Sequence, residues 1–319
     1  MSPQKRTTVR THARRLGMAA LGDVAPTLAA RAAARLFLTP PRVRASSREQ
    51  HALSQGEPFA VRLGAGTLRC WRIGEGPAVL LVHGWGGRAG QLTAFAPALR
   101  ERGCSAVTFD APAHGSSSGR IASVPEFADA ISAVARYAGA RAAIGHSVGA
   151  AGLALAMLRG TWLDGAVFVG PPRNPAGFYD RFCEALGLGR RVREMARWRV
   201  EQRAGVPFED LDLARMGPAL ATPLLVIHDR ADQEVSWAEG AAIAGAWPGA
   251  RLTSTDGLGH RRILRDGGVA AEAAQFVADR IQRCGCGRFA CAASGEQRLC
   301  DGCLLAEDMF DRRGRSMRA

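Results

Sequence analysis

The chain has 319 residues, 47% of them hydrophobic, and a formal net charge of +13. That length and apolar content suffice for one large domain with a sizeable core, and no apolar run is long enough to span a bilayer. Arginine carries almost all the positive charge, with Lys5 as the only lysine, and no stretch alternates basic and aromatic residues as in single-strand binders. Nucleic acid is therefore not an expected partner.

Residues 1–56 are rich in arginine, and we expect a basic helical extension. Arg31 and Arg35 fall on one face of a helix that Pro40 and Pro41 would end. The apolar stripe expected to pack on the domain consists of Ala32, Leu36 and Phe37. A transit peptide or peripheral membrane contact is the alternative. Because a secretory apolar segment is missing, we expect a cytoplasmic location.

Beyond residue 57, strand-like apolar runs alternate with helix-length segments, a pattern that predicts an α/β fold with a doubly wound, mostly parallel sheet. The expected strands are 59–63, 67–73, 78–83, 106–110, 141–144, 166–169, 224–228 and 251–255. The expected helices are 89–100, 124–137, 148–158, 237–246 and 269–283.

Two segments match the pattern G-x-S-x-G, one centred on Ser147 and one on Ser117. Ser147 follows a short apolar strand and precedes small residues that begin a helix. A sharp strand-to-helix turn at that place exposes a serine hydroxyl at the carboxyl end of the strand. Ser117 instead lies in a polar loop that no strand enters. We therefore predict that Ser147 is a nucleophile.

A serine nucleophile needs a base, and the base needs an acid that fixes its tautomer. The order nucleophile, acid, histidine is expected for this type of sheet. His260 follows the last expected strand, and Asp229 and Asp232 follow the strand before it. Asp232 has a loop in which to turn inward, so we predict a triad of Ser147, Asp232 and His260, with Asp229 as the competing acid.

From about residue 57 to residue 283, the chain resembles the α/β-hydrolase superfamily. The motifs are "VLLVHGWGG", "FDAPAHGSS", "GHSVGA", "HDRADQEV" and "GLGHRRIL", in the family's order. One departure is Ala113, where the family usually has glycine. The resemblance implies an oxyanion hole formed by the backbone N–H groups of Trp85 and Val148, in a loop shaped by His83 and Gly84.

A serine at the nucleophile position argues against the dehalogenases and epoxide hydrolases of this fold, which use aspartate. What remains is acyl chemistry, and we favour hydrolysis of carboxylic esters, with a small-molecule acyl substrate and no cofactor for catalysis. The alternatives are an acyltransferase or thioesterase of the same fold, or an inactive binding protein. The sequence does not indicate the oligomeric state.

A short helical lid is expected at about residues 171–222. Phe178, Phe182, Leu186 and Leu188 are candidates for an acyl pocket, although their helical spacing also suits simple packing. The lid also contains a basic stretch that would favour an anionic substrate only if it faced the pocket. Its arginines are Arg190, Arg191, Arg193, Arg197, Arg199 and Arg203.

Residues 284–319 form a small tail that holds five of the eight cysteines. Clustered thiols in a cytoplasmic chain favour a metal over disulfides, although redox chemistry or no ligand are the alternatives. Cys300 and Cys303 have the spacing of a metal-binding knuckle, and Cys286 and Cys291 would complete a tetrahedral zinc site, with Cys284 as a spare.

If these four thiolates hold a structural zinc ion, protein purified without chelator should contain about one zinc ion per chain. Elemental analysis should show the metal lost from a Cys300→Ser/Cys303→Ser variant. That variant should still turn over esters, because the predicted triad belongs to the sheet. Wild-type protein without metal, with its tail thiols free or in disulfides, would contradict the zinc site.

Overall fold

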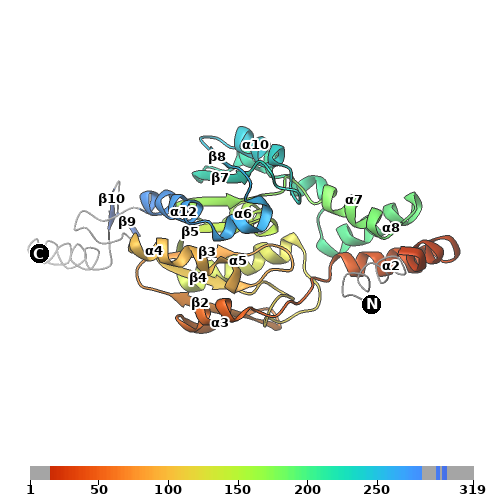
Figure 1. Ribbon diagram of the computed structural model, residues 1–319, viewed down its shortest axis with the longest axis horizontal. Coiled ribbons are helices and arrows are strands. Elements are labelled where there is room, and N and C mark those ends of the chain that lie inside the picture. The colour runs from red at the N-terminus through yellow and green to blue at the C-terminus, as the bar shows by residue number, and fades with distance from the viewer. Residues whose placement is uncertain (1–14, 282–291, 295–296, 300–319) are drawn as a thin grey trace, which may run out of the picture.

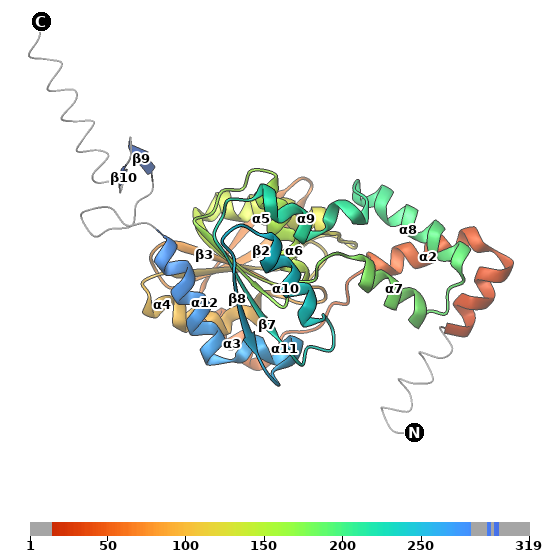
Figure 2. The same ribbon diagram turned by 90° about the horizontal axis from the view of Figure 1, so that it is seen from above.

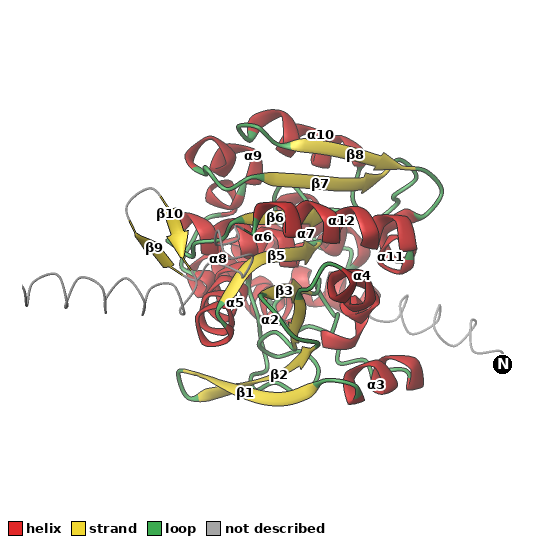
Figure 3. Cartoon of the chain, turned by 90° about the vertical axis from the view of Figure 1, so that its left-hand side faces the viewer, coloured by secondary structure: helices red, strands yellow, loops and turns green. Residues whose placement is uncertain are grey.

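The computed structural model describes residues 15–281, 292–294 and 297–299. Its main sheet has eight strands in the order β1-β2-β4-β3-β5-β6-β7-β8 (Figures 1 and 3). β1 pairs with β2 and β2 with β4 in antiparallel fashion, and the other neighbours are parallel. The predicted doubly wound, mostly parallel sheet is confirmed. The strands are β1 (Glu57–Leu63), β2 (Gly66–Ile73), β3 (Ala78–Val82), β4 (Ser105–Phe109), β5 (Ala140–His146), β6 (Gly165–Val169), β7 (Leu224–Asp229) and β8 (Arg251–Thr255).

Helices cover both faces of this sheet, and each face has its own apolar core. The central strands therefore read as continuous apolar runs, and all five residues of β3 are buried. One face carries α5 (Val124–Ala138), α6 (Val148–Leu158), α9 (Leu213–Met216) and α10 (Trp237–Ala246). The other face carries η1 (Ala89–Phe95), α4 (Ala96–Glu101), η4 (Ile263–Arg265) and α12 (Gly267–Arg280).

The lid and the helix of the N-terminal segment lie side by side, away from the sheet (Figures 1 and 2). A third apolar cluster joins them. The lid consists mainly of α7 (Ala176–Ala185) and α8 (Arg190–Ala204), followed by η2 (Phe208–Leu211) and η3 (Gly217–Ala219), and α2 (Pro26–Phe37) packs along α8. The buried face of α2 is made of Ala29, Ala30, Ala33 and Ala34. The predicted stripe is thus only partly right: Phe37 packs in this cluster, but the partner is the lid and Leu36 is exposed.

The N-terminal segment then reaches the sheet through α3 (Ser47–Ser54). Ser46 caps α3: its hydroxyl accepts from the Glu49 N–H, and the Glu49 carboxylate accepts from the Ser46 N–H at 2.7 Å. Glu49 also forms a buried ion pair with Arg88, 2.6 Å apart, which ties α3 to the loop after β3.

In the tail, β9 (Ala292–Ser294) and β10 (Gln297–Leu299) form an antiparallel pair. Cys286, Cys291, Cys300 and Cys303 lie outside the described residues, so the zinc site stays a prediction. Within the described ranges, no group of three or more His, Cys, Asp or Glu side chains is arranged to hold a metal ion. No helix in those ranges has the length and apolar character needed to cross a membrane.

Candidate active site

Ser147 occupies the turn between β5 and α6 with φ +52° and ψ −124°, a conformation that L-residues seldom adopt. The flanking glycines make this turn possible. A Cβ on Gly145 would lie 2.5 Å from the Leu153 side chain, and one on Gly149 would lie 2.6 Å from the carbonyl oxygens of Val82 and His83. The turn therefore requires glycine on both sides and projects Ser147 from the carboxyl end of the sheet.

The His260 imidazole lies beside the Asp232 carboxylate, with Nδ1 2.7 Å from Oδ2. His260 comes from α11 (Gly259–Arg262) after β8, and Asp232 from the loop after β7. The second carboxylate oxygen, Oδ1, accepts from the backbone N–H groups of Glu234 at 2.8 Å and Val235 at 2.9 Å. The acid is thereby fixed in one orientation toward His260.

Sequence reasoning did not assign a role to His228, which lies behind this acid. His228 Nε2 is 3.4 Å from Asp232 Oδ2 and 3.1 Å from the carbonyl oxygen of Val235. Burial would raise the pKa of Asp232, but hydrogen bonds from His228, His260 and the Val235 N–H outweigh it and hold that pKa well below its usual value. Asp232 is therefore ionised at neutral pH.

Asp229, the competing acid, is fully buried and makes a different set of contacts. Its Oδ2 accepts from the Thr255 hydroxyl at 2.7 Å and the Leu258 N–H at 2.9 Å, and its Oδ1 accepts from the Ala231 N–H at 3.0 Å. These bonds hold the loop that leads to His260 onto the end of β7. The structure thus brings Asp232, and not Asp229, into contact with the imidazole of His260.

Two buried imidazoles connect the loop after β3 to the loop after β4. His83 Nδ1 donates to the Gly84 carbonyl oxygen at 2.7 Å, and Nε2 accepts from the Ala111 N–H at 3.0 Å. His114 Nε2 accepts from the Gly86 N–H at 3.0 Å, while Nδ1 donates to Pro112. Accepting an N–H requires a neutral ring, so His83 holds the Ala111 N–H, and His114 holds the Gly86 N–H next to Trp85, only while the two rings are unprotonated.

Ala113 lies in the second of these loops with φ +65°. Its backbone adopts a conformation that glycine reaches at no steric cost, which accounts for the glycine usual at this position in similar sequences. The neighbouring Asp110 stabilises the same loop by accepting from the N–H groups of Ala89 at 2.9 Å and Ser116 at 2.8 Å.

His146, the residue before Ser147, contacts the backbone of the candidate base. Its Nε2 donates to the His260 carbonyl oxygen at 2.9 Å, and the two rings lie 4.6 Å apart between centroids. Its Nδ1 is buried and has no hydrogen-bond partner among the described residues. This bond ties the serine turn to the histidine loop from inside the protein.

Ser147 and His260 both line a cavity of about 770 Å³, together with Trp85 and Val148. This volume is in the range of small-molecule sites. From the lid, Phe178 and Phe182 line it too. The other two candidates, Leu186 and Leu188, pack in the core between the lid and α2.

The basic stretch of α8 does not face this cavity: none of its six arginines is among the described lining residues. Arg190 pairs with Glu194, Arg203 with Glu126, and Arg197 with Glu201 and Glu209. The arginines of α8 therefore give no support for an anionic substrate.

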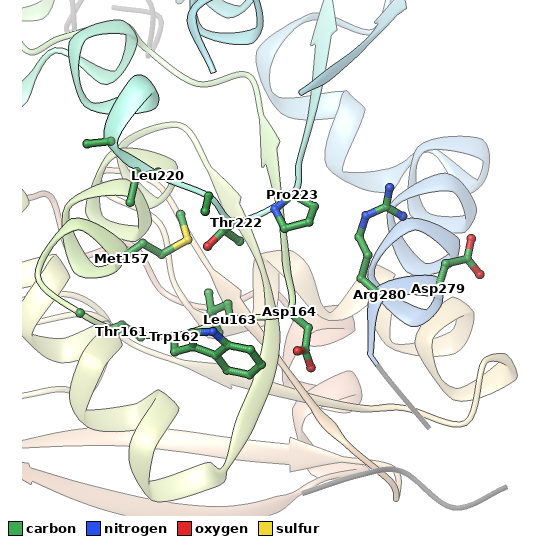
Figure 4. Close-up of a pocket in the computed structure, with 13 residues that line it drawn as sticks. Met157, Thr161, Trp162, Leu163, Asp164, Leu220, Thr222, Pro223, Asp279 and Arg280 are labelled. Carbon is green, nitrogen blue, oxygen red and sulfur yellow. The ribbon is translucent and has the colours of Figure 1, made fainter. Parts of the chain in front are cut away.

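A second cavity of about 650 Å³ lies at the opposite, amino end of β6 and β7 (Figure 4). Trp162 and Asp164 border it before β6, Thr222 and Pro223 before β7, and Arg280 at the end of α12. It contains none of the residues predicted for catalysis, so the cavity at Ser147 is the candidate active site.

A sequence profile described as "Alpha/beta hydrolase family" matches residues 79–273, more than half of the chain. The structure is similar to esterase Pf2001 of Pyrococcus furiosus, at 18% identity and TM-score 0.59, over 77% of this chain and 98% of the esterase. It is also similar to esterase RhEst1 of Rhodococcus sp. ECU1013, at 17% identity and TM-score 0.51, over 71% and 99%.

A further similar structure is Est1E of Butyrivibrio proteoclasticus with ferulic acid bound, at 19% identity and TM-score 0.54, over 70% of this chain and 99% of Est1E. At these identities the likeness shows the fold and leaves the substrate open. No curated protein sequence matches the chain.

The buried histidines predict how stability depends on pH. Burial lowers the pKa of His83 to about 4 and that of His114 to about 3, from 6.5. Between pH 6.5 and 4 the unfolded chain therefore binds protons that the folded chain does not, so the free energy of unfolding falls as the pH falls, by up to about 1.4 kcal/mol per pH unit for each such histidine.

Denaturant unfolding of wild type and His114→Gln at pH 6.5, 5.5 and 4.5 measures this dependence. We expect the variant to be less stable at pH 6.5. Its free energy of unfolding should fall less steeply on acidification, because about one proton fewer is taken up on unfolding. Parallel pH profiles for the two proteins would contradict the assignment of His114 as a neutral, loop-linking group.

Proposed function

Because the chain belongs to the α/β-hydrolase family, we propose that it is a serine hydrolase that cleaves carboxylic esters through an acyl-enzyme. The observation that carries the proposal is the 2.7 Å contact between His260 Nδ1 and the buried carboxylate of Asp232, beside the cavity that His260 and Ser147 both line. With Nδ1 held by the carboxylate, the imidazole has Nε2 available as a base for the hydroxyl of Ser147, which lines the same cavity. The esterase activity of the similar structures agrees with this proposal.

In the proposed reaction Ser147 Oγ attacks the ester carbonyl carbon, and His260 Nε2 takes the hydroxyl proton. The tetrahedral intermediate collapses when its bond to the alkoxy oxygen breaks, and His260 donates the proton to the leaving alcohol. A water molecule then attacks the acyl-enzyme, with His260 again as base, and releases the acid and free Ser147. Asp232 remains ionised throughout and stabilises the imidazolium.

The carbonyl oxygen gains negative charge in both steps and needs fixed donors. We assign these to the backbone N–H groups of Trp85 and Val148. Val148 is the first residue of α6, and the first N–H groups of a helix have no partner within the helix. Trp85 belongs to the loop that His83 and His114 hold, so its peptide is fixed before substrate binds.

Neither half-reaction requires a cofactor, and the proposed zinc of the tail takes no part in either. The expected partner is a small-molecule acyl substrate. The cytoplasmic location stays a prediction.

The nucleophile is tested by Ser147→Ala. Wild-type protein should hydrolyse short activated esters such as p-nitrophenyl acetate, and the variant should lose several orders of magnitude in kcat/KM. His260→Gln should do the same while the folded protein retains its far-UV circular dichroism. A Ser147→Ala protein as active as wild type would place the chemistry elsewhere.

The acid is tested by the pair Asp232→Asn and Asp229→Asn. We expect Asp232→Asn to lose most of its kcat, because the amide no longer fixes the tautomer of His260. Asp229→Asn should lose much less kcat and mainly lower the free energy of unfolding, because its carboxylate binds loop N–H groups and Thr255. Equal losses of kcat, or a larger loss for Asp229→Asn, would overturn the assignment.

A further inference from the structure

The N-terminal segment supplies a wall of the cavity that contains the nucleophile. Leu36, Phe37, Leu38, Thr39, Pro41 and Val43 all line it, although they precede the first strand of the sheet. Two of these are large apolar residues with much of their surface exposed, Leu36 at 46% and Val43 at 55%. Exposed apolar groups gathered around a catalytic serine indicate a surface that substrate covers.

The lid holds one end of this wall. The Phe37 ring lies 5.2 Å from the Tyr179 ring and 5.3 Å from the Phe182 ring, in edge-on contacts, and α2 packs along α8. Phe182 itself lines the cavity. The wall and the lid therefore form one structure.

The loop after β4 holds the other end. The Arg42 guanidinium donates to the carbonyl oxygens of Gly115 at 3.1 Å, Ser117 at 3.0 Å and Gly119 at 2.8 Å. Pro41 packs on the loop after β3, which contains Trp85: a Cβ on Gly86 in this loop would lie 2.9 Å from the Pro41 ring. With both ends fixed, residues 36–43 keep one position relative to Ser147.

The charges that border the cavity are paired or lie at its rim. Arg88 pairs with Glu49, and Arg261 with Glu234. Arg265 is exposed. Among the described lining residues, a carboxylate or phosphate on the acyl chain would thus meet no buried cation that lacks an acidic partner, whereas an uncharged apolar chain would meet Phe37, Phe178 and Phe182.

We propose that residues 36–43 form one wall of an acyl-binding chamber and give the enzyme a preference for esters with an extended, uncharged apolar acyl chain. This inference rests on the proposed ester hydrolysis and names its substrate class. Burial of each methylene favours binding about fourfold, so an octanoyl ester should exceed an acetyl ester in kcat/KM by at least tenfold.

The matched variants are Leu36→Asp, Val43→Asp and Leu28→Asp. Leu28 lies on α2 about two turns before Leu36 and is 55% exposed, but it is not among the lining residues. With p-nitrophenyl octanoate and acetate as substrates, the octanoate-to-acetate ratio of kcat/KM should fall about tenfold in Leu36→Asp and Val43→Asp and stay at the wild-type value in Leu28→Asp. An unchanged ratio in both wall variants, or an equal fall in Leu28→Asp, would overturn the proposal.

Binding of the neutral fluorophore N-phenyl-1-naphthylamine separates this inference from the proposed activity. We expect its Kd to rise about tenfold in Leu36→Asp and Val43→Asp and to stay the same in Leu28→Asp. If wild type hydrolyses no ester, the proposed function fails, while this pattern of Kd values would still support the chamber wall. A probe that does not bind wild type, or binds all four proteins equally, would overturn the wall whatever the activity.

Discussion

Ser147 has a backbone conformation that costs of the order of 1–3 kcal/mol for a residue with a side chain, and the surrounding structure has to hold it there. β5 enters the turn paired with a neighbour on each side, and α6 leaves it buried on the sheet. Gly145 and Gly149 let strand and helix approach to distances that no Cβ would allow. The loops that would form the site are placed around this one turn. His146 bonds to the backbone of His260, and the loop after β3 packs against the turn so closely that a Cβ on Gly84 would lie 3.0 Å from the Ser147 Cβ.

Buried imidazoles and carboxylates connect the loops at the carboxyl end of the sheet. His83 and His114 link the loops after β3 and β4, and Asp229 and Asp232 link the ends of β7 and β8. These hydrogen bonds depend on one protonation state of each group: the histidines are neutral and the carboxylates are ionised. The same interactions therefore set the geometry of the site and its sensitivity to acid.

The sequence predicted the sheet well because its strands are apolar on both faces, as in 78–83, where β3 runs from Ala78 to Val82. Ser147, Asp232 and His260 could be proposed because each follows a strand in a fixed chain order. The position of α2 could not be predicted, because an alanine face suits any apolar partner and only the fold brings α8 beside it. Likewise, helical spacing does not show that Phe178 and Phe182 reach the cavity while Leu186 and Leu188 turn into the lid core.

The central claim is that Ser147 is an activated nucleophile, and covalent labelling tests it most directly. Folded wild-type protein should react with a fluorophosphonate probe, and mass spectrometry of the digested product should place the adduct on Ser147. Ser147→Ala should not be labelled, and His260→Gln should be labelled far more slowly because its serine has no base. Folded wild-type protein that takes up no label, or labels on another residue at the same rate in Ser147→Ala, would contradict the account.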